Sequence, residues 1–383
     1  MKKIKVIHFH NGSGGGVLSV IKNLLQFSQH KYIEHHIVYT ININITKHYP
    51  LNNIVGAASE QVFYYSSKWN FYYTCKQLYK LFDDDALLVT HDWLELGMAS
   101  NLGLQNKIVS FLHGDYDYYY QLAIGHQQAV DAFFCIAKSI QQQLSISINN
   151  ALIKICYTPF PVPNALSSAN KNINKNIVFV GRLTSDKGYH LLPLIDSILQ
   201  KQHVKLHWHI IGEINSESKM VTWDENSTTN FYGNIDNEEV IKLLENMTYF
   251  ILPSIAEGMP VSLIEAMKAK LIPFVNDIKG GIQELIENNV TGFKILNNEP
   301  NYYANAILSI IHNLPLIYWL QNNAKDRADT LFNPTINTQN IENLMYEIYQ
   351  MPNKLKISKK VYGSRFDQKW MPNGITKLVR KFN

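Results

Sequence analysis

The sequence has few cysteines, few charged residues and no long hydrophobic segment. Of its 383 residues, three are cysteines and 17% are charged. Three cysteines without C-x-x-C spacing exclude a disulfide framework and a cysteine-based zinc site, and they favour a reducing compartment. No stretch reaches the ~18 apolar residues of a membrane span, and His8, His10 and Asn11 interrupt the N-terminal apolar run that would otherwise resemble a signal peptide. We therefore expect a cytoplasmic protein, either soluble or peripherally bound at the inner face of the membrane.

The charge balance is close to neutral. Lys and Arg number 35 and Asp and Glu number 31, for a net charge of +4. This balance excludes a dedicated nucleic-acid binder, which would need a concentrated basic face. The hydrophobic fraction of 46% is enough to bury more than one core. At roughly 150 residues per domain, the length predicts two or three domains.

The order of apolar segments predicts two doubly wound α/β domains. Short apolar, β-branched runs predict strands at 4–9, 36–43, 86–90, 107–112 and 132–136 in the first half and at 177–180, 207–211, 249–252 and 272–276 in the second. They alternate with glycine turns and with segments of helical periodicity, a pattern that implies parallel sheets. Three prolines between Pro159 and Pro163 and a polar stretch over 167–176 mark the break. We predict an N-terminal Rossmann-like domain at 1–160, a linker at 161–176 and a C-terminal Rossmann-like domain at 177–350. Ligands of such sheets bind at the carboxyl ends of the strands.

The remaining segment, 351–383, forms a basic tail. From Lys354 onward it contains nine Lys or Arg residues and one acid, Asp367, with Trp370 and other apolar residues interleaved, Phe382 among them. Such a composition is compatible with contact with an anionic membrane. The interpretation that we favour is a C-terminal helix that packs back on the N-terminal domain through Trp370 and its apolar neighbours, with its basic face in solvent.

The most informative motif is the segment from Pro253 to Met267, between a predicted strand and a predicted helix. Pro260 suits the first helical turn, so Glu257 falls in the loop and Glu265 inside the helix. The loop amides and the helix N-terminus predict an anion site. Two carboxylates beside an anion site are explained if they bind hydroxyl groups. A nucleotide sugar offers that combination of a diphosphate, a ribose diol and sugar hydroxyls.

A second motif follows the first strand of the C-terminal half. Arg182 and Lys187 lie in a loop bounded by Gly181 and Gly188. Two positioned cations can stabilise the charge that a diphosphate leaving group gains as its bond to the sugar breaks. Placed before the Glu257 segment, these cations strengthen the prediction of a nucleotide-sugar site.

Together these residues resemble the family 4 retaining glycosyltransferases of the GT-B fold, whose signature is two glutamates separated by seven residues, as Glu257 and Glu265 are. The resemblance is strongest from about 177 to 295. It implies two Rossmann-like domains that face each other across a cleft, and metal-independent transfer of a sugar with retention. It also implies that Arg182 and Lys187 hold the diphosphate, that Glu265 binds the ribose and that Glu257 contacts the donor sugar. Backbone amides would come from four further positions: Gly258, Met259, Val261 and Ser262.

Two N-terminal features fit the same family. Gly14, Gly15 and Gly16 lie at the start of the first predicted helix. In relatives, the loop at this place approaches the donor phosphates and the acceptor. His113 follows a predicted strand, and a histidine at that place in relatives faces the donor sugar. We therefore count His113, Arg182, Lys187 and Glu257 as the catalytic candidates.

One position departs from the family and one agrees with it. Relatives commonly have a glycine near position 270, where this chain has Lys270, so a differently built helix end is expected there. Gly280 and Gly281 match the family's next glycine turn.

Other polar clusters have simpler explanations. Asp83, Asp84 and Asp85 formally contain a D-x-D metal motif, but they precede a strand, so we interpret them as a solvated helix end. The tyrosines at 116, 118, 119 and 120 could stack on an acceptor sugar, although such clusters more often pack. His8 and His10 are weak candidates for the cleft.

The sequence therefore predicts a retaining glycosyltransferase that moves a hexose-type sugar from a nucleotide-diphosphate sugar to a glycan or lipid-linked acceptor, in cell-surface polysaccharide synthesis. We expect no metal and no cofactor beyond the donor substrate, and no nucleic-acid partner. Two alternatives remain open. One is a nucleotide-sugar epimerase on the same fold, and the other is a non-catalytic nucleotide-sugar-binding scaffold.

Overall fold

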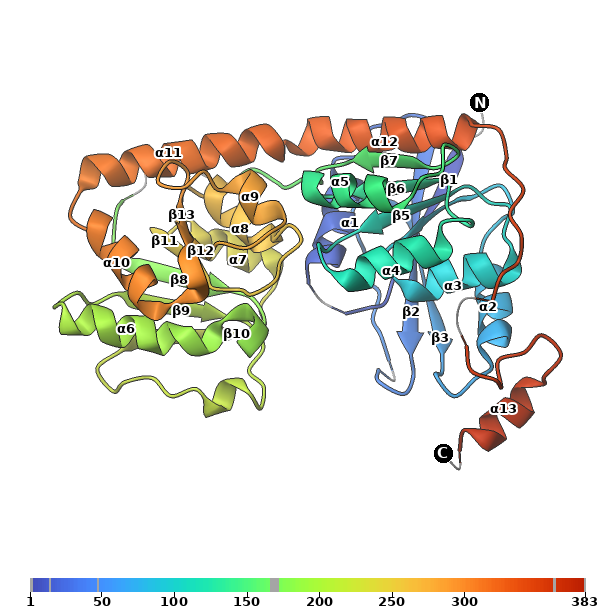
Figure 1. Cartoon of the computed structure of the whole chain (residues 1–383), viewed down its shortest axis with the longest axis horizontal. Coiled ribbons are helices and arrows are strands. Elements are labelled where there is room, and N and C mark those ends of the chain that lie inside the picture. Colours follow the sequence, from blue (N-terminus) through green and yellow to red (C-terminus); the bar gives the residue numbers. More distant parts are fainter. Residues whose placement is uncertain (1–2, 14, 47, 166–171, 361–362, 382–383) are drawn as a thin grey trace. The chain divides into compact units, whose positions relative to one another are not determined.

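The computed structural model describes residues 3–13, 15–46, 48–165, 172–360 and 363–381. The chain divides into two compact units, one formed by residues 1–161 together with 335–383 and the other by residues 162–334. Each unit is built on a parallel β-sheet, as the sequence predicts (Figure 1). The second boundary, at 334/335, differs from the predicted domain limit at 350. The last long helix and the basic tail therefore belong to the first unit.

The first unit has a seven-stranded sheet of order β3-β2-β1-β4-β5-β6-β7. All neighbouring strands are parallel. The strands are β1 (Ile4–His10), β2 (Ile33–Asn42), β3 (Ala57–Tyr65), β4 (Leu87–Thr90), β5 (Ile108–Leu112), β6 (Ala132–Cys135) and β7 (Lys154–Tyr157). The connecting helices are α1 (Gly16–Gln26), α2 (Phe71–Tyr79), α3 (Trp93–Leu102), α4 (Asp117–His126) and α5 (Lys138–Ser147). The central strands are rich in buried apolar residues because helices cover both faces of such a sheet.

The second unit has a six-stranded parallel sheet of order β10-β9-β8-β11-β12-β13. Its strands are β8 (Asn176–Val180), β9 (His207–Ile211), β10 (Thr228–Gly233), β11 (Tyr249–Leu252), β12 (Ile272–Asn276) and β13 (Phe293–Ile295). Its helices are α6 (Leu192–Lys201), α7 (Asn237–Leu244), α8 (Val261–Lys268), α9 (Gly281–Leu285), α10 (Pro300–Ile310) and α11 (Leu314–Leu331). Four 3₁₀ turns lie at Ser185–Lys187, Tyr189–Leu191, Ser218–Met220 and Leu296–Asn298. Helix α6 packs against α10, and α8 packs against α7 and α11.

Two helices of the first unit follow the second unit in sequence. They are α12 (Pro334–Gln350) and α13 (Asn373–Val379). Glu342 of α12 is fully buried and accepts a hydrogen bond from Ser28 at 2.5 Å. The described residues include no helix with the length and apolarity that a membrane crossing requires.

Candidate functional site

The order of the strands indicates where a ligand binds to the second sheet, at the carboxyl ends of two central strands. The chain order reverses between β8 and β11, which are neighbours in the sheet. At such a reversal the connections that follow the two strands run to opposite faces of the sheet, and ligands of doubly wound sheets bind outside the carboxyl ends of the strands at this point. These loops, 181–188 and 253–260, contain five of the predicted site residues, and three more lie in α8 directly after the second loop.

A glycine and a backbone hydrogen bond hold the two loops together. Gly188 has φ +71°, and a Cβ at this position would lie 2.1 Å from the carbonyl oxygen of Pro253. The amide of Ile255 donates to the carbonyl oxygen of Asp186 at 2.9 Å. Only glycine allows so close an approach, so the backbone of the first loop is fixed against the start of the second.

The structure brings Lys187 and Glu257 into direct contact. The Nζ atom of Lys187 lies 2.6 Å from Oε1 of Glu257, and their side chains are 17% and 10% exposed. Arg182 differs, because its side chain is 70% exposed and pairs with Asp186 at 2.8 Å. The lysine is therefore held in place at the sheet edge, whereas the arginine lies at the surface.

The start of α8 has the features of an anion site. Pro260 is its N-cap residue, no side chain caps the helix, and its first turn contains no acid. The hydroxyl of Ser262 donates to the carbonyl oxygen of Val180 at 3.2 Å, so it does not serve the helix amides. The amides of the first turn, from Val261 on, therefore keep the partial positive charge that favours a bound anion. Met259 just before the helix is buried.

The carbonyl of Gly258 faces a third loop. It accepts a hydrogen bond from the amide of Gly281 at 2.6 Å, and a Cβ on Gly281 would lie 2.5 Å from that oxygen. The turn after β12 is thereby attached to the loop that carries Glu257. This contact places the predicted glycine turn of 280–281 beside the site.

Glu265 lies within α8 and is 6% exposed. Its Oε1 accepts a hydrogen bond from Nδ2 of Asn237 at 3.1 Å. Burial raises the pKa of Glu265 from 4.5 to about 7, although the hydrogen bond from Asn237 acts in the opposite direction. The predicted site residues of the second unit therefore make two separate contacts. Lys187 pairs with Glu257, and Glu265 pairs with Asn237 at the start of α7.

The predicted site residues of the first unit lie at the carboxyl ends of the strands of its own sheet. There the strand order reverses between β1 and β4. The Nδ2 atom of Asn11, after β1, donates to Asp92, after β4, at 3.2 Å. Gly15, with φ +122°, is the N-cap of α1, and Gly16 is its first residue. Gly14 lies outside the described residues.

His113 follows β5 and is paired with a second histidine. Its Nε2 lies 2.8 Å from Nδ1 of His91, which follows β4. Burial, and then the proximity of His10, lower the pKa of His113 to about 3. Both imidazoles are neutral near pH 7, since burial also lowers the pKa of His91 well below 6.5. His113 can therefore exchange hydrogen bonds with a ligand but cannot supply a positive charge.

The other histidines of the first unit are part of its interior. His8 is fully buried in β1, and its Nε2 lies 2.9 Å from Nδ1 of His35. His35 in turn pairs with Glu342 of α12 at 3.0 Å. His10 lies at the end of β1, and burial is the main cause that lowers its pKa to about 4.

The tyrosine cluster and the aspartate cluster of the sequence lie at opposite ends of the first sheet. Tyr118 donates to Asp92 at 2.6 Å, and the ring of Tyr119 lies 6.4 Å from that of His113. The tyrosines therefore border the histidine pair. Asp83 precedes β4, at the end of that strand opposite to the histidine pair. Its Oδ2 lies 2.6 Å from Nζ of Lys5.

Lys270 follows α8 and has φ +58°. Its amide donates to the carbonyl oxygen of Met267, and the amide of Leu271 donates to that of Ala266, both at 2.9 Å. This is the left-handed turn that glycine usually provides after a helix. The expectation of a differently built helix end is therefore wrong: the turn is the usual one, with lysine in the glycine position.

Five residues that take part in these contacts were not predicted as site residues: Asn11, His91, Asp92, Asp186 and Asn237. His91 and Asp92 had a visible signal, because they directly follow a predicted strand. Asn237 lies 28 residues before Glu265 in the sequence. Only the packing of α7 against α8 brings the two together.

A family model matches most of the second unit, and curated glycosyltransferases match part of the chain. The model of the family described as "Glycosyl transferases group 1" matches residues 166–327. An amylovoran biosynthesis glycosyltransferase, AmsK of Erwinia amylovora, is 30% identical over 170 residues, which cover 42% of each chain. An O-antigen biosynthesis glycosyltransferase, WbnH of Escherichia coli, is 31% identical over 169 residues, 44% of this chain and 47% of the relative. The match thus spans less than half the length of these relatives.

A solved structure matches across both units. Anabaena HepE, in complex with UDP and glucose, aligns with a TM-score of 0.69 and 16% identity, covering 90% of this chain and 100% of that one. At this level of identity the likeness concerns the fold. It confirms the predicted GT-B class, with two Rossmann-like domains in one chain.

Proposed function

We propose that this chain, which carries a group 1 glycosyltransferase domain at residues 166–327, transfers a hexose-type sugar from a nucleotide-diphosphate sugar to a glycan or lipid-linked acceptor. The observation that carries the proposal is the contact between Lys187 and Glu257 at the edge where β8 and β11 diverge. It places a cation and a carboxylate beside the uncapped start of α8. A diphosphate linked to a sugar would satisfy both kinds of group.

We assign the donor to the second unit. The diphosphate would lie against the first-turn amides of α8, with Lys187 and Arg182 as its cations. Charge-assisted hydrogen bonds of this kind contribute roughly 1.5–3 kcal/mol each. Glu265 would accept hydrogen bonds from the ribose hydroxyls, and Glu257 would accept them from the donor sugar while it keeps Lys187 in place.

We propose that the sugar is transferred with retention and without a metal. The bond between the anomeric carbon and the diphosphate oxygen breaks, and the acceptor oxygen bonds to that carbon from the same face. The acceptor proton passes to the departing phosphate oxygen. The negative charge that develops on the diphosphate is stabilised by Lys187, Arg182 and the start of α8.

We assign the sugar hydroxyls and the acceptor to residues of the first unit. His113 is neutral and can exchange hydrogen bonds with a hydroxyl, and Gly15 leaves room before Gly16, the first residue of α1. Amylovoran and O-antigen synthesis, named for the two relatives, support an acceptor in a cell-surface polysaccharide pathway. We place the reaction in the cytoplasm, and the three cysteines are free thiols, as a reducing compartment would leave them.

The test incubates the purified chain with a panel of nucleotide sugars, with and without glycan acceptors, and measures nucleoside-diphosphate release and glycosylated product. We expect acceptor-dependent release with one donor, and an α-configured product from an α-configured donor. Lys187→Ala and Glu265→Ala should abolish transfer and leave the circular dichroism spectrum unchanged. Lys294→Ala is the matched control, since this lysine pairs with Gln283 in the same unit.

Three outcomes would contradict the proposal. Conversion of a donor in the absence of any acceptor indicates an epimerase. Saturable binding without turnover across the panel indicates a scaffold. Turnover by Lys187→Ala at the wild-type rate removes the site assignment.

A further inference from the structure

The basic tail is attached to the first unit by buried polar contacts. The side chain of Lys356 is 2% exposed, and its Nζ lies 2.5 Å from Oδ2 of Asp131 and 2.5 Å from the carbonyl oxygen of Asn106. Lys107 donates in return to the carbonyl oxygen of Pro352 at 2.8 Å. The start of the tail is therefore a fixed part of the fold.

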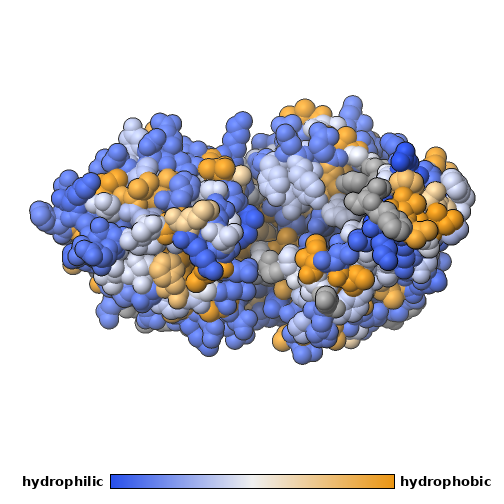
Figure 2. Space-filling model, turned by 90° about the horizontal axis from the view of Figure 1, so that it is seen from below, coloured by the Kyte–Doolittle hydropathy of each residue, from blue (hydrophilic) through white to orange (hydrophobic). Residues whose placement is uncertain are grey.

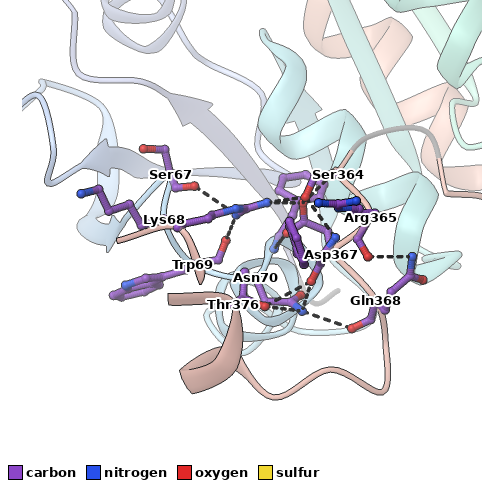
Figure 3. Close-up of polar contacts among 12 residues, drawn as sticks. Ser67, Lys68, Trp69, Asn70, Ser364, Arg365, Asp367, Gln368 and Thr376 are labelled. Carbon is purple, nitrogen blue, oxygen red and sulfur yellow. Dashed lines mark hydrogen bonds and ion pairs between the residues drawn. The ribbon is translucent and has the colours of Figure 1, made fainter. Parts of the chain in front are cut away.

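A second group of contacts fixes the loop before α13, and Figure 3 shows it at the start of α2. Asp367 accepts from the amide of Phe71 at 2.6 Å and from Arg380 at 2.5 Å. Nδ2 of Asn70 lies 3.2 Å from each of three carbonyl oxygens of the loop, those of Phe366, Gln368 and Met371. The loop is thus held by hydrogen bonds and an ion pair.

These polar anchors leave three apolar side chains of the segment exposed, while Phe366, Met371 and Val379 are partly buried. Thr376 of α13 is fully buried, whereas Trp370 is 76%, Leu378 60% and Ile375 52% exposed. The tail does belong to the first unit, but the expectation that it packs there through Trp370, Ile375 and Leu378 is wrong. A single exposed apolar residue is ordinary, but three on one fixed segment indicate a surface that is covered in use.

The charges around these residues are of one sign. Residues 363–381 contain five Lys or Arg and one acid, Asp367, which is buried and paired with Arg380. The adjoining segment 66–76 contains two lysines and no acid. Lys377 lies 4.8 Å from the ring centre of Trp69, and Lys369 lies 5.4 Å from that of Tyr72. Two lysines of the tail therefore lie over aromatic rings of the adjoining segment.

We call this surface the tail face and define it by Trp69, Lys369, Trp370, Ile375, Lys377 and Leu378. Figure 2 shows hydrophobic and hydrophilic side chains side by side on the view from below. We propose that the tail face binds the surface of an anionic phospholipid bilayer. The apolar side chains would enter the headgroup region, while the lysines contact lipid phosphates. Tryptophan is favoured at that depth because its ring is amphipathic.

The composition of the tail face favours this occupant over two others. A second copy of the chain would bring an identical cationic face against it in a two-fold contact, and like charges would repel. Nucleic acid would satisfy the lysines, but Ile375 and Leu378 gain nothing from a phosphate backbone. A bilayer with anionic headgroups satisfies both the charge and the apolar side chains.

The test measures binding of the full chain to sedimented vesicles, in the absence of nucleotide sugar. One set of vesicles contains phosphatidylcholine alone, and the other also contains phosphatidylglycerol. One variant combines Trp370→Ser, Ile375→Ser and Leu378→Ser, and another combines Lys369→Gln, Lys377→Gln and Lys381→Gln. The matched controls make the same changes in the second unit, at the exposed residues Trp319, Leu194 and Ile214, and Lys201, Lys205 and Lys219.

We expect binding to the anionic vesicles only. Loss of three surface lysines should weaken it about 100-fold, on the basis of about 1 kcal/mol per lysine near such a surface. The serine variant should also lose binding, and both controls should bind as the wild type does. Binding should weaken as ionic strength rises from about 0.1 M to about 1 M, because the Debye length falls from about 10 Å to about 3 Å.

Because vesicle binding is measured without donor or acceptor, it stands or fails separately from the transferase activity. Equal binding to neutral vesicles, no vesicle binding, or unchanged binding by both tail variants would overturn the proposal. A wild-type dimer that the serine variant converts to a monomer would identify a second copy as the occupant and overturn it as well.

Discussion

The buried carboxyl of Glu265 predicts a pH-dependent cost to the stability of the ligand-free protein. Burial raises its pKa from 4.5 to about 7. In the unfolded chain the carboxyl returns to its ordinary value, so between these limits the folded state binds more protons than the unfolded state. Stability therefore falls as pH rises through this window. The full shift corresponds to about 3 kcal/mol, at 1.36 kcal/mol for each pKa unit.

The perturbation that isolates this effect is Glu265→Gln, because glutamine is uncharged throughout and its oxygen can still accept from Asn237. Relative to the wild type, the variant should gain under about 1 kcal/mol at about pH 5 and about 3 kcal/mol at about pH 8. Glu239→Gln, on the exposed side of α7, is the matched control.

The assay is urea denaturation in which unfolding is monitored by hydrogen exchange of peptides from β8 and β11. These peptides report on the unfolding of the second unit alone. A second readout is affinity for the nucleoside diphosphate of the donor. The wild type should bind more tightly as pH rises through about 7, because the ribose hydroxyls need the ionised carboxylate, and the variant should show no such rise. The reasoning is refuted if wild type and variant show the same pH dependence of stability.

Three further changes test other contacts. Lys270→Gly should raise the free energy of unfolding by up to about 1 kcal/mol, since glycine relieves a left-handed conformation that costs roughly 1–2 kcal/mol, whereas Ala269→Gly should lower it in the same urea titration. Asp131→Asn should destabilise the first unit by about 3 kcal/mol because it leaves Lys356 buried without its partner, and limited proteolysis should then cut the tail faster. His91→Phe should lower kcat/KM at least about tenfold, because it removes the hydrogen bond to His113. His91→Asn should keep most of the wild-type kcat/KM, because the asparagine side chain can replace Nδ1 in that hydrogen bond. Equal rates for the two variants would exclude a positioning role.

The central strands of both sheets could be predicted from the sequence, whereas the edge strands could not. The four strands of the structure that the sequence did not predict are all edge strands: β3, β7, β10 and β13. Central strands are covered on both faces, so their sequences are rich in apolar residues, with a few buried histidines in β1 and β2. Edge strands such as Thr228–Gly233 are partly exposed and polar, and only their pairing with a neighbour identifies them.

The same distinction applies to the site and to the tail. The spacing of Glu257 and Glu265 is local, so the sequence could place both on the loop and helix after one strand. The pairing of His91 with His113 and of Asn237 with Glu265 depends on which strands and helices become neighbours. The exposure of Trp370 could not be predicted either, because polar anchors made by Asp367 determine which side of the segment faces the protein.

The most direct test of the account is calorimetric titration of a panel of nucleoside diphosphates into the wild type and into Lys187→Ala. We predict saturable binding of one nucleoside diphosphate, and a loss of about 10- to 100-fold in affinity on removal of the lysine, as expected for one charge-assisted contact. Lys294→Ala should bind as the wild type does. Failure of every diphosphate to bind, or wild-type affinity in Lys187→Ala, would contradict a diphosphate site between the loops that follow β8 and β11.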